Sequence, residues 1–461
     1  MMSEKKIGTS LFIFRKDLRL ADNIALNQAL KHEKTVLVYI FDPHDPTGEA
    51  GLLWLHHSLL SLEQSLKNNH LNLIFRQGDF EKEVLKLIDE SQCNTIYMNR
   101  HSSPFIRRIE SEIHQKLENT AIKTEVYDSC FLHRFDDIST GSSTPYKVFT
   151  PYYNTVIKLT KRLPVAFARG EAENLSLKSL KLADLGLVSP KDWTKDLIKR
   201  WQVGEAHALQ KLHSFESRSS SYIKNRDFPF LEDGTSQLSP HLAFGEISPI
   251  QIFAHLRNHK VGAAPWLRQI VWRDFAHYLL WHFPYTESKP LRKEFQNFPH
   301  QANPKWLKAW QKGQTGFPIV DAGMRELWAT GWMHNRVRMI VASFLVKDMP
   351  ESYEAGEAWF RHTLVDFDEA NNIFGWQWSA GCGADAQPYF RIFNPMSQGE
   401  KFDNQATYIK SWIPELENID PVKIHKLDFK AAGTYPTPIL DHGQERLKSL
   451  EALEKMKSLK S

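Results

Sequence analysis

The sequence predicts two domains of different class: an α/β domain built on a doubly wound parallel sheet, followed by a domain that is almost entirely α-helical. At 461 residues the chain is longer than one hydrophobic core usually organises. Short apolar runs alternate with helical patterns only in the first part. Of the 14 tryptophans, only Trp54 precedes position 193. The composition therefore changes near the middle of the chain.

Five apolar runs predict the strands of the first domain, which we place at residues 8–130. A buried parallel strand is covered on both faces and therefore reads as a continuous apolar run. Helical patterns separate the runs, as at 52–68. The runs lie at 11–14, 36–41, 71–75, 95–98 and 124–128. Neither GxGxxG nor a GxxxxGKS or GxxxxGKT loop follows the first run, so the expected fold suggests a ligand without naming it.

Residues 131–205 predict a long, partly helical connector, because prolines interrupt their mixed polar and apolar segments. From 206 to 461 the periodic segments are helical, for example 249–259 and 335–348. This second domain should be nearly all α.

Composition excludes several classes of protein. The net charge of +4 is too small to identify a polyanion partner. Three scattered cysteines contain no CxxC pair, which argues against a disulfide framework and against a zinc or iron–sulfur site, so we expect no metal. The first ten residues lack the apolar core of a signal peptide, and no apolar run is long enough to span a membrane. We therefore expect a cytoplasmic protein.

The segment DFDEANNIFGWQW, residues 366–378, is unusual because it crowds carboxylates and amides among indoles. A carboxylate that tryptophans shield from water needs a cationic partner, and Arg338 is the candidate. A carboxylate pair for glycoside hydrolysis is an alternative, although two aspartates two positions apart need not converge. A metal site is a weaker one, because no histidine lies at a ligand spacing.

Three further segments carry candidate binding residues. Hydroxyls at 235–239 precede an apolar helix, where they either cap it or bind phosphate. The segment WLRQIVWRDF at 266–275 places Trp266, Gln269 and Arg273 on one side of a helix, with Trp272 close by. These side chains could stack on a base and hydrogen-bond to its edge, or they could pack in a hydrophobic core. Basic and aromatic residues alternate in 388–403, which suits a phosphate backbone or plain packing.

Four ordered motifs resemble those of the photolyase and cryptochrome family, and most closely those of class I cyclobutane pyrimidine dimer photolyases. They are FRKDLRLADN at 14–23, TGWMHNRVRM at 330–339, DFDEANNIFGWQW, and PYFRIFNPMSQGEKFD at 388–403. The similarity runs from about residue 8 to 420. It implies an N-terminal domain of the type that holds an antenna chromophore, here of unknown identity, and a C-terminal helical domain that binds FAD.

The resemblance also implies roles for individual residues. Asp366 would pair with Arg338, Asn372 would face flavin N5, and Trp376 would be the first electron donor to the flavin. Trp376, Asn372 and Gln269 are the expected catalytic residues. The expected cofactor-binding residues are Tyr222, Thr235, Ser236, Leu238, Ser239, Trp266, Arg273, Trp332, Arg338, Asp366, Asp368 and Asn372.

The implied partner is damaged DNA, in which a pyrimidine dimer is flipped out of the duplex. Trp272 and Trp378 would stack on the dimer, and the arginines would hold the backbone. The branch of the family that repairs the (6-4) photoproduct has histidines where this chain has Asn335 and Met339, so the cyclobutane dimer is favoured. The expected lesion-binding residues are Arg226, Gln269, Trp272, Asn335, Arg336, Met339 and Trp378.

Departures from the family pattern keep a second function open. Gln269 replaces a usual glutamate, and Tyr353 and His300 replace two tryptophans of the electron relay, with Trp359 as a candidate detour. The segment 100–112 lacks the Asn and Glu of folate-antenna proteins.

The expected function is light-driven repair by a monomer without an obligate protein partner. The alternatives are a cryptochrome-like blue-light receptor that binds FAD and a module that only recognises damage.

Overall fold

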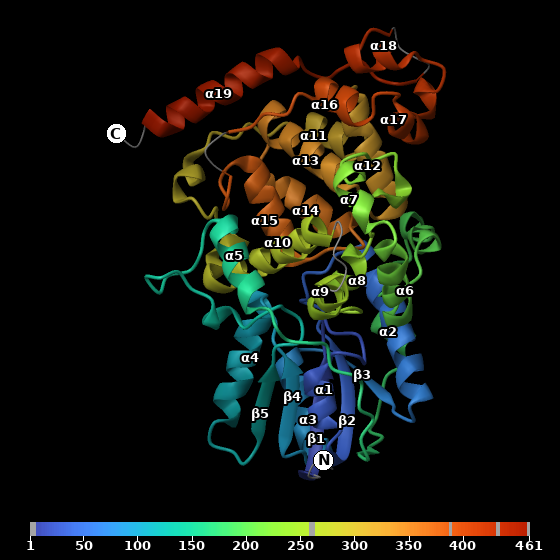
Figure 1. The fold of residues 1–461 in the computed structure, drawn as a ribbon, viewed down its shortest axis with the longest axis vertical. Helices are drawn as coiled ribbons and strands as arrows, with labels where there is room; N and C mark the ends of the chain where they lie inside the picture. The colour runs from blue at the N-terminus through green and yellow to red at the C-terminus, as the bar shows by residue number, and fades with distance from the viewer. Residues whose placement is uncertain (1–5, 258–262, 387–389, 430–433, 459–461) are drawn as a thin grey trace.

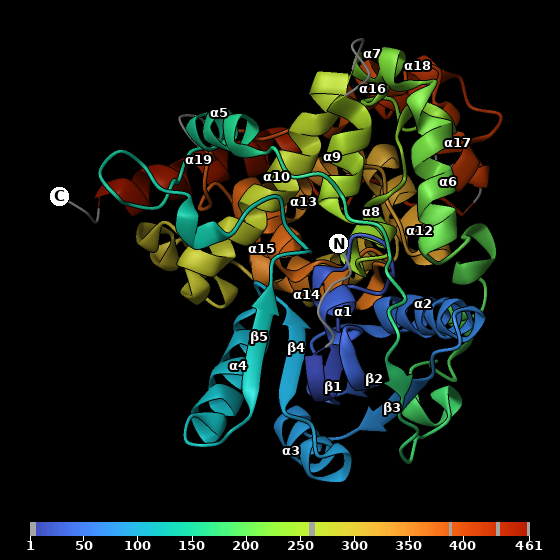
Figure 2. The same cartoon turned by 60° about the horizontal axis from the view of Figure 1, so that its bottom comes forward.

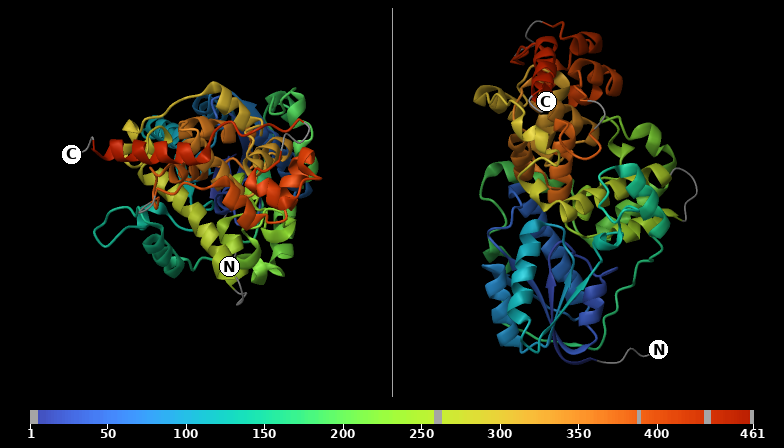
Figure 3. Two further views of the ribbon diagram at one scale, coloured as in Figure 1. Left: turned by 90° about the horizontal axis from the view of Figure 1, so that it is seen from above. Right: turned by 90° about the vertical axis from the view of Figure 1, so that its left-hand side faces the viewer.

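A computed structural model describes residues 6–257, 263–386, 390–429 and 434–458. The parallel sheet and its helices lie at one end of the molecule, and a larger body of helices lies at the other end (Figures 1 and 3). Residues 388 and 389, which begin the fourth motif of the sequence, lie outside the described residues.

The sheet has the strand order β3-β2-β1-β4-β5, and each neighbouring pair in this order is parallel. Its strands are β1 (Lys6–Phe14), β2 (His32–Phe41), β3 (Leu73–Gln77), β4 (Thr95–Asn99) and β5 (Lys123–Tyr127). The chain winds from β1 outward through β3 and then returns to β4, so the order reverses beside β1. This is the doubly wound sheet that the apolar runs predict, and such sheets bind ligands at the carboxyl ends of the strands beside the reversal.

Four helices cover the two faces of the sheet: α1 (Ile24–Ala29), α2 (Glu49–Asn68), α3 (Phe80–Ser91) and α4 (Pro104–Leu117). Figure 2 shows α1 and α2 on one face and α3 and α4 on the other. Successive side chains of a strand point to opposite faces. Accordingly, Phe12 and Phe14 of β1 belong to the core beneath α1 and α2, whereas Leu11 and Ile13 belong to the core beneath α3 and α4.

The connector contributes to both parts of the molecule. Helix α5 (Phe149–Leu159) packs in the core that contains α10 (Ala263–His282) of the helical part. The chain then returns to the sheet, where the short strand β6 (Glu173–Asn174) pairs with Lys34 and Thr35 of β2. The sequence does not predict β6, because two residues give no periodic signal.

The described residues of the second part form helices joined by loops and no strands. Its longer helices are α6 (Glu205–Glu216), α9 (Pro249–Arg257), α10 (Ala263–His282), α11 (Pro304–Gln311), α12 (Pro318–Thr330), α13 (Asn335–Ser343), α14 (Tyr353–Thr363), α15 (Glu369–Ala380), α16 (Pro395–Phe402) and α19 (His442–Ser458). The shorter ones are α7 (Tyr222–Asn225), α8 (Ser239–Ala243), α17 (Thr407–Trp412) and α18 (Pro421–Lys426). The single helix predicted over 335–348 is α13 followed by a π-helical turn at Phe344–Asp348.

Two glycines position the helices around the candidate site. Gly331 ends α12 with a φ of +68°, a left-handed conformation that glycine adopts without strain, and the chain turns there into α13. Gly356 of α14 lies against Trp376, where an added Cβ would come within 2.1 Å of the indole. A side chain at 356 would therefore displace Trp376 or α14.

No helix in the described parts of the chain combines the length and the apolar character needed to cross a membrane.

Candidate functional site

The unusual segment 366–378 forms the start and body of α15. Asp368 is the N-cap residue, and its carboxylate accepts a hydrogen bond from the backbone N–H of Asn371. An aspartate at this position satisfies an otherwise unpaired amide and interacts favourably with the helix dipole. The cap explains why the carboxylates precede the helix while Asn372, Trp376 and Trp378 lie on it.

The structure contains the ion pair that the sequence predicts between Arg338 and Asp366. Arg338 Nη2 lies 2.7 Å from Asp366 Oδ2, and Arg338 Nε donates to the carbonyl of Met333. Asp366 is 6% exposed, and its second oxygen, Oδ1, is buried without a protein partner. A buried carboxylate oxygen of this kind needs a hydrogen-bond donor, which a ligand can supply.

Asp368 is held as an anion. Burial opposes its ionisation, but His277 Nε2 at 3.0 Å and Arg273 at 3.8 Å outweigh that cost, so its pKa lies well below the usual range. The other ring nitrogen of His277 lies 2.6 Å from Ser102 Oγ, which follows β4. The polar chain from Ser102 through His277 to Asp368 therefore crosses from the sheet to the helical part.

The predicted hydroxyl segment lies in the turn that leads into α8. Ser239 Oγ accepts a hydrogen bond of 3.2 Å from the indole N–H of Trp332. Gln237, between Ser236 and Leu238, has a φ of +51°, and the Leu238 N–H donates to Ser236 Oγ. The contact with Trp332 links this turn to the loop before α13.

Trp266 and Tyr222 are joined by a residue that the sequence did not single out. The ring of Phe215, on α6, packs edge-on against Trp266 at 4.6 Å and against Tyr222 at 5.7 Å between centroids. Arg273 lies two turns along α10 from Trp266 and donates to the carbonyls of Leu242 and Cys130. These contacts hold α7, α8 and α10 together.

Asn372 and Trp376 are both buried on α15. The Asn372 amide donates to the carbonyl of Glu357, 3.1 Å away. Trp376 is 2% exposed, and its indole N–H has no protein partner. Its ring packs edge-on against Phe360 at 5.0 Å and against Trp310 at 6.2 Å.

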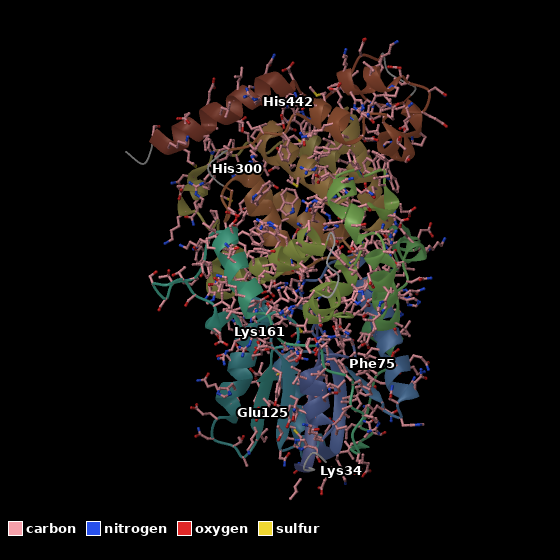
Figure 4. All side chains as sticks on the ribbon, in the orientation of Figure 1. Lys34, Phe75, Glu125, Lys161, His300 and His442 are labelled. Atoms are coloured by element: carbon pink, nitrogen blue, oxygen red, sulfur yellow. The ribbon has the colours of Figure 1, made fainter. Side chains whose placement is uncertain are left out.

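Trp310 is a neighbour of Trp376 that the sequence does not indicate, because nothing local distinguishes it from other buried aromatics. Of the expected relay residues, Tyr353 is buried on α14, and burial raises its pKa well above the usual value. His300 is exposed (Figure 4). Trp359 is stacked on Trp328, at 5.8 Å and 4°. No ring contact between Trp359 and Trp376 occurs among the described residues.

The expected lesion-binding residues of α13 lie near its first turn. His334 is the N-cap, and its ring accepts from the Arg336 N–H. Burial lowers the pKa of His334 to about 4, so the imidazole is neutral and able to accept. Arg336 donates to Asp227 at 2.8 Å, and Arg226 Nε lies 3.8 Å from the same carboxylate. Asn335 Nδ2 lies 3.9 Å from Met339 Sδ.

Met339 and Trp378 share a cavity of about 510 Å³, including its opening to solvent. Its other lining residues are Ser343, Lys347, Ser379, Gly381, Asp385, Ala386, Arg391 and Phe393. Burial lowers the pKa of Lys347 to about 7, and its amine donates to the Arg391 carbonyl. The cavity therefore has one wall from α13 and one from α15.

Gln269 and Trp272 are not among the residues that line this cavity. Phe149 of α5 stacks on one face of Trp272, with centroids 3.5 Å apart and planes at 5°. That face is therefore unable to stack on a base. The amide of Gln269 makes only a 3.5 Å contact with the Pro265 carbonyl.

A second cavity, of about 960 Å³ with its opening, lies at the carboxyl ends of the strands. Residues that follow β1, β2 and β4, among them Lys16, Asp42 and Ser102, line one side, and His277 and Asp368 line the other. Burial lowers the pKa of His101, another lining residue, well below its usual value. The cavity lies where the strand order reverses, as expected for a doubly wound sheet.

Comparison with known proteins agrees with this architecture. Residues 10–168 match a family described as DNA photolyase, and residues 266–455 match one described as FAD binding domain of DNA photolyase. The chain is 41% identical to the deoxyribodipyrimidine photo-lyase of Agrobacterium fabrum, over 96% of this chain and 97% of that protein.

Two solved structures are also similar. A bacterial class III photolyase from Agrobacterium tumefaciens has a TM-score of 0.93 and 39% identity, with 99% of each chain covered. An archaeal photolyase from Sulfolobus tokodaii, solved with two FAD molecules, has a TM-score of 0.86 and 32% identity, over 97% of this chain and 100% of that one.

The fold and the site define a two-domain flavin-binding protein. The chain belongs to the DNA photolyase family. The predicted fold class is confirmed. The class I subgroup stays a prediction, since one of the similar structures is a class III photolyase. The residues present fit FAD, because Asp366 Oδ1 and the Trp376 indole N–H are buried polar atoms without protein partners.

Proposed function

We propose that this protein is a deoxyribodipyrimidine photolyase, which uses light to split cyclobutane pyrimidine dimers in DNA. The observation that carries the proposal is the ion pair between Arg338 and the buried Asp366, whose second oxygen is unpartnered, in a helical part that matches an FAD-binding domain. When bound, FAD supplies a light-excited electron donor that takes the electron back after the dimer has split. No side chain needs to act as an acid or a base.

The residues around the cofactor act by holding charge and excluding water. Arg338 neutralises the charge of Asp366. The free oxygen of Asp366 can therefore accept a hydrogen bond from the cofactor without leaving an unpaired charge in the site. Asn372 is fixed by its bond to the Glu357 carbonyl and presents a neutral amide at the position that the resemblance assigns to flavin N5. An amide can form a hydrogen bond with N5 but, in contrast to a carboxylic acid, it cannot transfer a proton to it.

For the lesion, we assign the cavity between Met339 and Trp378. The indole of Trp378 is partly exposed and provides a stacking surface. Arg226 and Arg336 share Asp227 at the nearby end of α13, which fixes two guanidiniums where a phosphate backbone can contact them. Asn335 and Met339, in place of histidines, favour the cyclobutane dimer over the (6-4) photoproduct.

We assign the cavity at the carboxyl ends of the strands to a second chromophore of unknown identity. The support is its position between the sheet and Asp368, together with the similarity to an archaeal photolyase that was solved with two FAD molecules. We further propose that the protein acts as a cytoplasmic monomer.

The test of the proposed function is illumination of purified, reduced, FAD-loaded protein with oligonucleotides that contain either a cyclobutane dimer or a (6-4) photoproduct. Restored pyrimidines are counted against a dark control. We expect light-dependent loss of the cyclobutane dimer only. Repair of the (6-4) photoproduct alone would overturn the substrate assignment, and light-driven spectral changes without repair of either lesion would favour a cryptochrome-like receptor.

A further inference from the structure

Two histidines and a glutamate converge where α6 meets α9, away from the residues assigned above. His213 and Glu216 lie three positions apart on the last turn of α6 and therefore share one side of that helix. His255 comes from α9, beside α6 (Figures 1 and 2). One ligand atom from each of the three side chains lies within 4.8 Å of the other two.

We propose that His213, Glu216 and His255 bind a divalent transition-metal ion, with Zn²⁺ as the best match. Two imidazole nitrogens and one carboxylate oxygen are a donor set that Zn²⁺ uses in proteins, with water as the fourth ligand. Mg²⁺ and Ca²⁺ prefer sites made of oxygen atoms. The donor set therefore separates this site from an ordinary acidic surface cluster.

The spacing of the two imidazole rings matches the spacing expected around a tetrahedral ion. Their ring centroids are 4.9 Å apart, and their planes are inclined by 78°. With Zn–N distances near 2.0–2.1 Å and a tetrahedral angle, the ring centres should be about 5 Å apart. The separation of the ring centres is therefore compatible with both imidazoles binding one ion.

The carboxylate needs a small adjustment. His255 Nε2 lies 2.7 Å from Glu216 Oε2, the distance of a hydrogen-bonded ion pair. Two ligand atoms on a tetrahedral zinc lie about 3.3 Å apart, so the two side chains must separate slightly when the ion binds between them. The Glu216 and His255 side chains are 28% and 19% exposed, which leaves the ion a route from solvent.

The ion would tie α6 to α9 directly behind the aromatic contacts of the candidate cofactor site. Phe215, next to Glu216, packs on Trp266 and Tyr222. Bound metal should therefore slow the loss of FAD. This consequence rests on the proposed function, whereas metal binding itself does not. The expectation of no metal rested on cysteine spacing, and ligands from separate helices give no local motif in the sequence.

The test is equilibrium binding of Zn²⁺ to the full-length FAD-loaded protein, in competition with a chromophoric chelator. We expect one Zn²⁺ per chain and no displacement by millimolar Mg²⁺. His213→Ala and His255→Ala should each weaken binding by more than about tenfold, since even loss of a partner outside the ligand shell costs 10- to 100-fold. His207→Ala is the control, because His207 lies on the same helix and meets the Val203 carbonyl.

Circular dichroism establishes that each variant is folded. Failure of the native chain to bind Zn²⁺, or equal weakening by His207→Ala, would overturn the site. Zn²⁺ binding that leaves the rate of FAD release unchanged would overturn only the link to the cofactor. Normal Zn²⁺ binding by a protein that neither retains FAD nor repairs DNA would contradict the proposed function and leave the metal site standing.

Discussion

His277 Nε2 lies 3.0 Å from Asp368 Oδ2, within the helical part and beside its junction with the sheet. His277 belongs to α10, Asp368 caps α15, and Ser102 at the other nitrogen of His277 follows β4. One imidazole therefore connects the cavity above the sheet to the start of the helix that carries Asn372 and Trp376.

Replacing His277 with alanine should destabilise the protein by about 3 kcal/mol at pH 7, because it leaves the buried Asp368 carboxylate without its nearest side-chain partner. The folded-state pKa of Asp368 lies below its unfolded value, so its contribution is present above about pH 4 and is lost as the pH falls through the folded pKa. The difference in unfolding free energy between native and variant should therefore shrink in acid. Urea titrations at pH 7 and at a pH well below 3.8, the unfolded value, measure it. His282→Ala, whose imidazole meets the Phe135 carbonyl, should show no such narrowing.

Glu326 should produce the opposite pH dependence. Burial raises its pKa to about 7, although Tyr408 and the His334 N–H donate to it. A raised folded-state pKa contributes stability that is complete below the unfolded value near 4.5 and is lost as the pH rises through about 7. Between pH 5 and 8 the native protein should lose on the order of 2 kcal/mol relative to Glu326→Gln. If the free energy of unfolding of the two proteins depends on pH in the same way, Glu326 does not have a raised pKa. Glu417→Gln, at an exposed position, serves as the control.

Trp378→Ala should weaken binding of dimer-containing DNA by about 1–3 kcal/mol, because it removes a stacking surface from the cavity beside Met339. Fluorescence anisotropy with damaged and undamaged duplexes measures the loss, which should be confined to the damaged one. Trp328→Ala is a matched control, because that indole is 42% exposed and is stacked on Trp193 instead. A similar loss in both variants would show that the cavity does not hold the lesion.

Local patterns predicted much of this structure, and long-range contacts determine the rest. The apolar runs predict the five main strands because a strand buried on both faces has no polar alternation. That Arg338 lies near the carboxylates at 366–368 was predictable because a carboxylate among indoles requires a cation, and the family resemblance implied Asp366 as its partner. The Ser102–His277–Asp368 chain and the approach of Trp310 to Trp376 were not, since they join segments far apart in sequence. Phe149 stacks on one face of Trp272, and this contact was likewise not predictable because it depends on where the connector packs.

The electron relay to the flavin should be slow in this chain. In the relay that the family resemblance implies, electrons would reach Trp376 by hopping between neighbouring donors, and Tyr353 and His300 stand where the family has its two outer tryptophans. Tyr353 must lose a proton to be a comparable donor, and burial raises its pKa well above the usual value. Photoreduction of FAD in the native chain should therefore be slow compared with the variant Tyr353→Trp/His300→Trp. Flavin bleaching under blue light with an external thiol measures the rate.

The residual rate should depend on the indole that the structure places beside Trp376. Trp310, at 6.2 Å, is that indole, whereas Trp359 stacks on Trp328 toward the exposed surface. If the detour runs through Trp359, then Trp359→Phe should slow bleaching further; if Trp310 is the next donor, Trp310→Phe should do so instead. A native chain that bleaches as fast as the double variant and is unaffected by either phenylalanine would show that the relay assigned by family resemblance does not operate here.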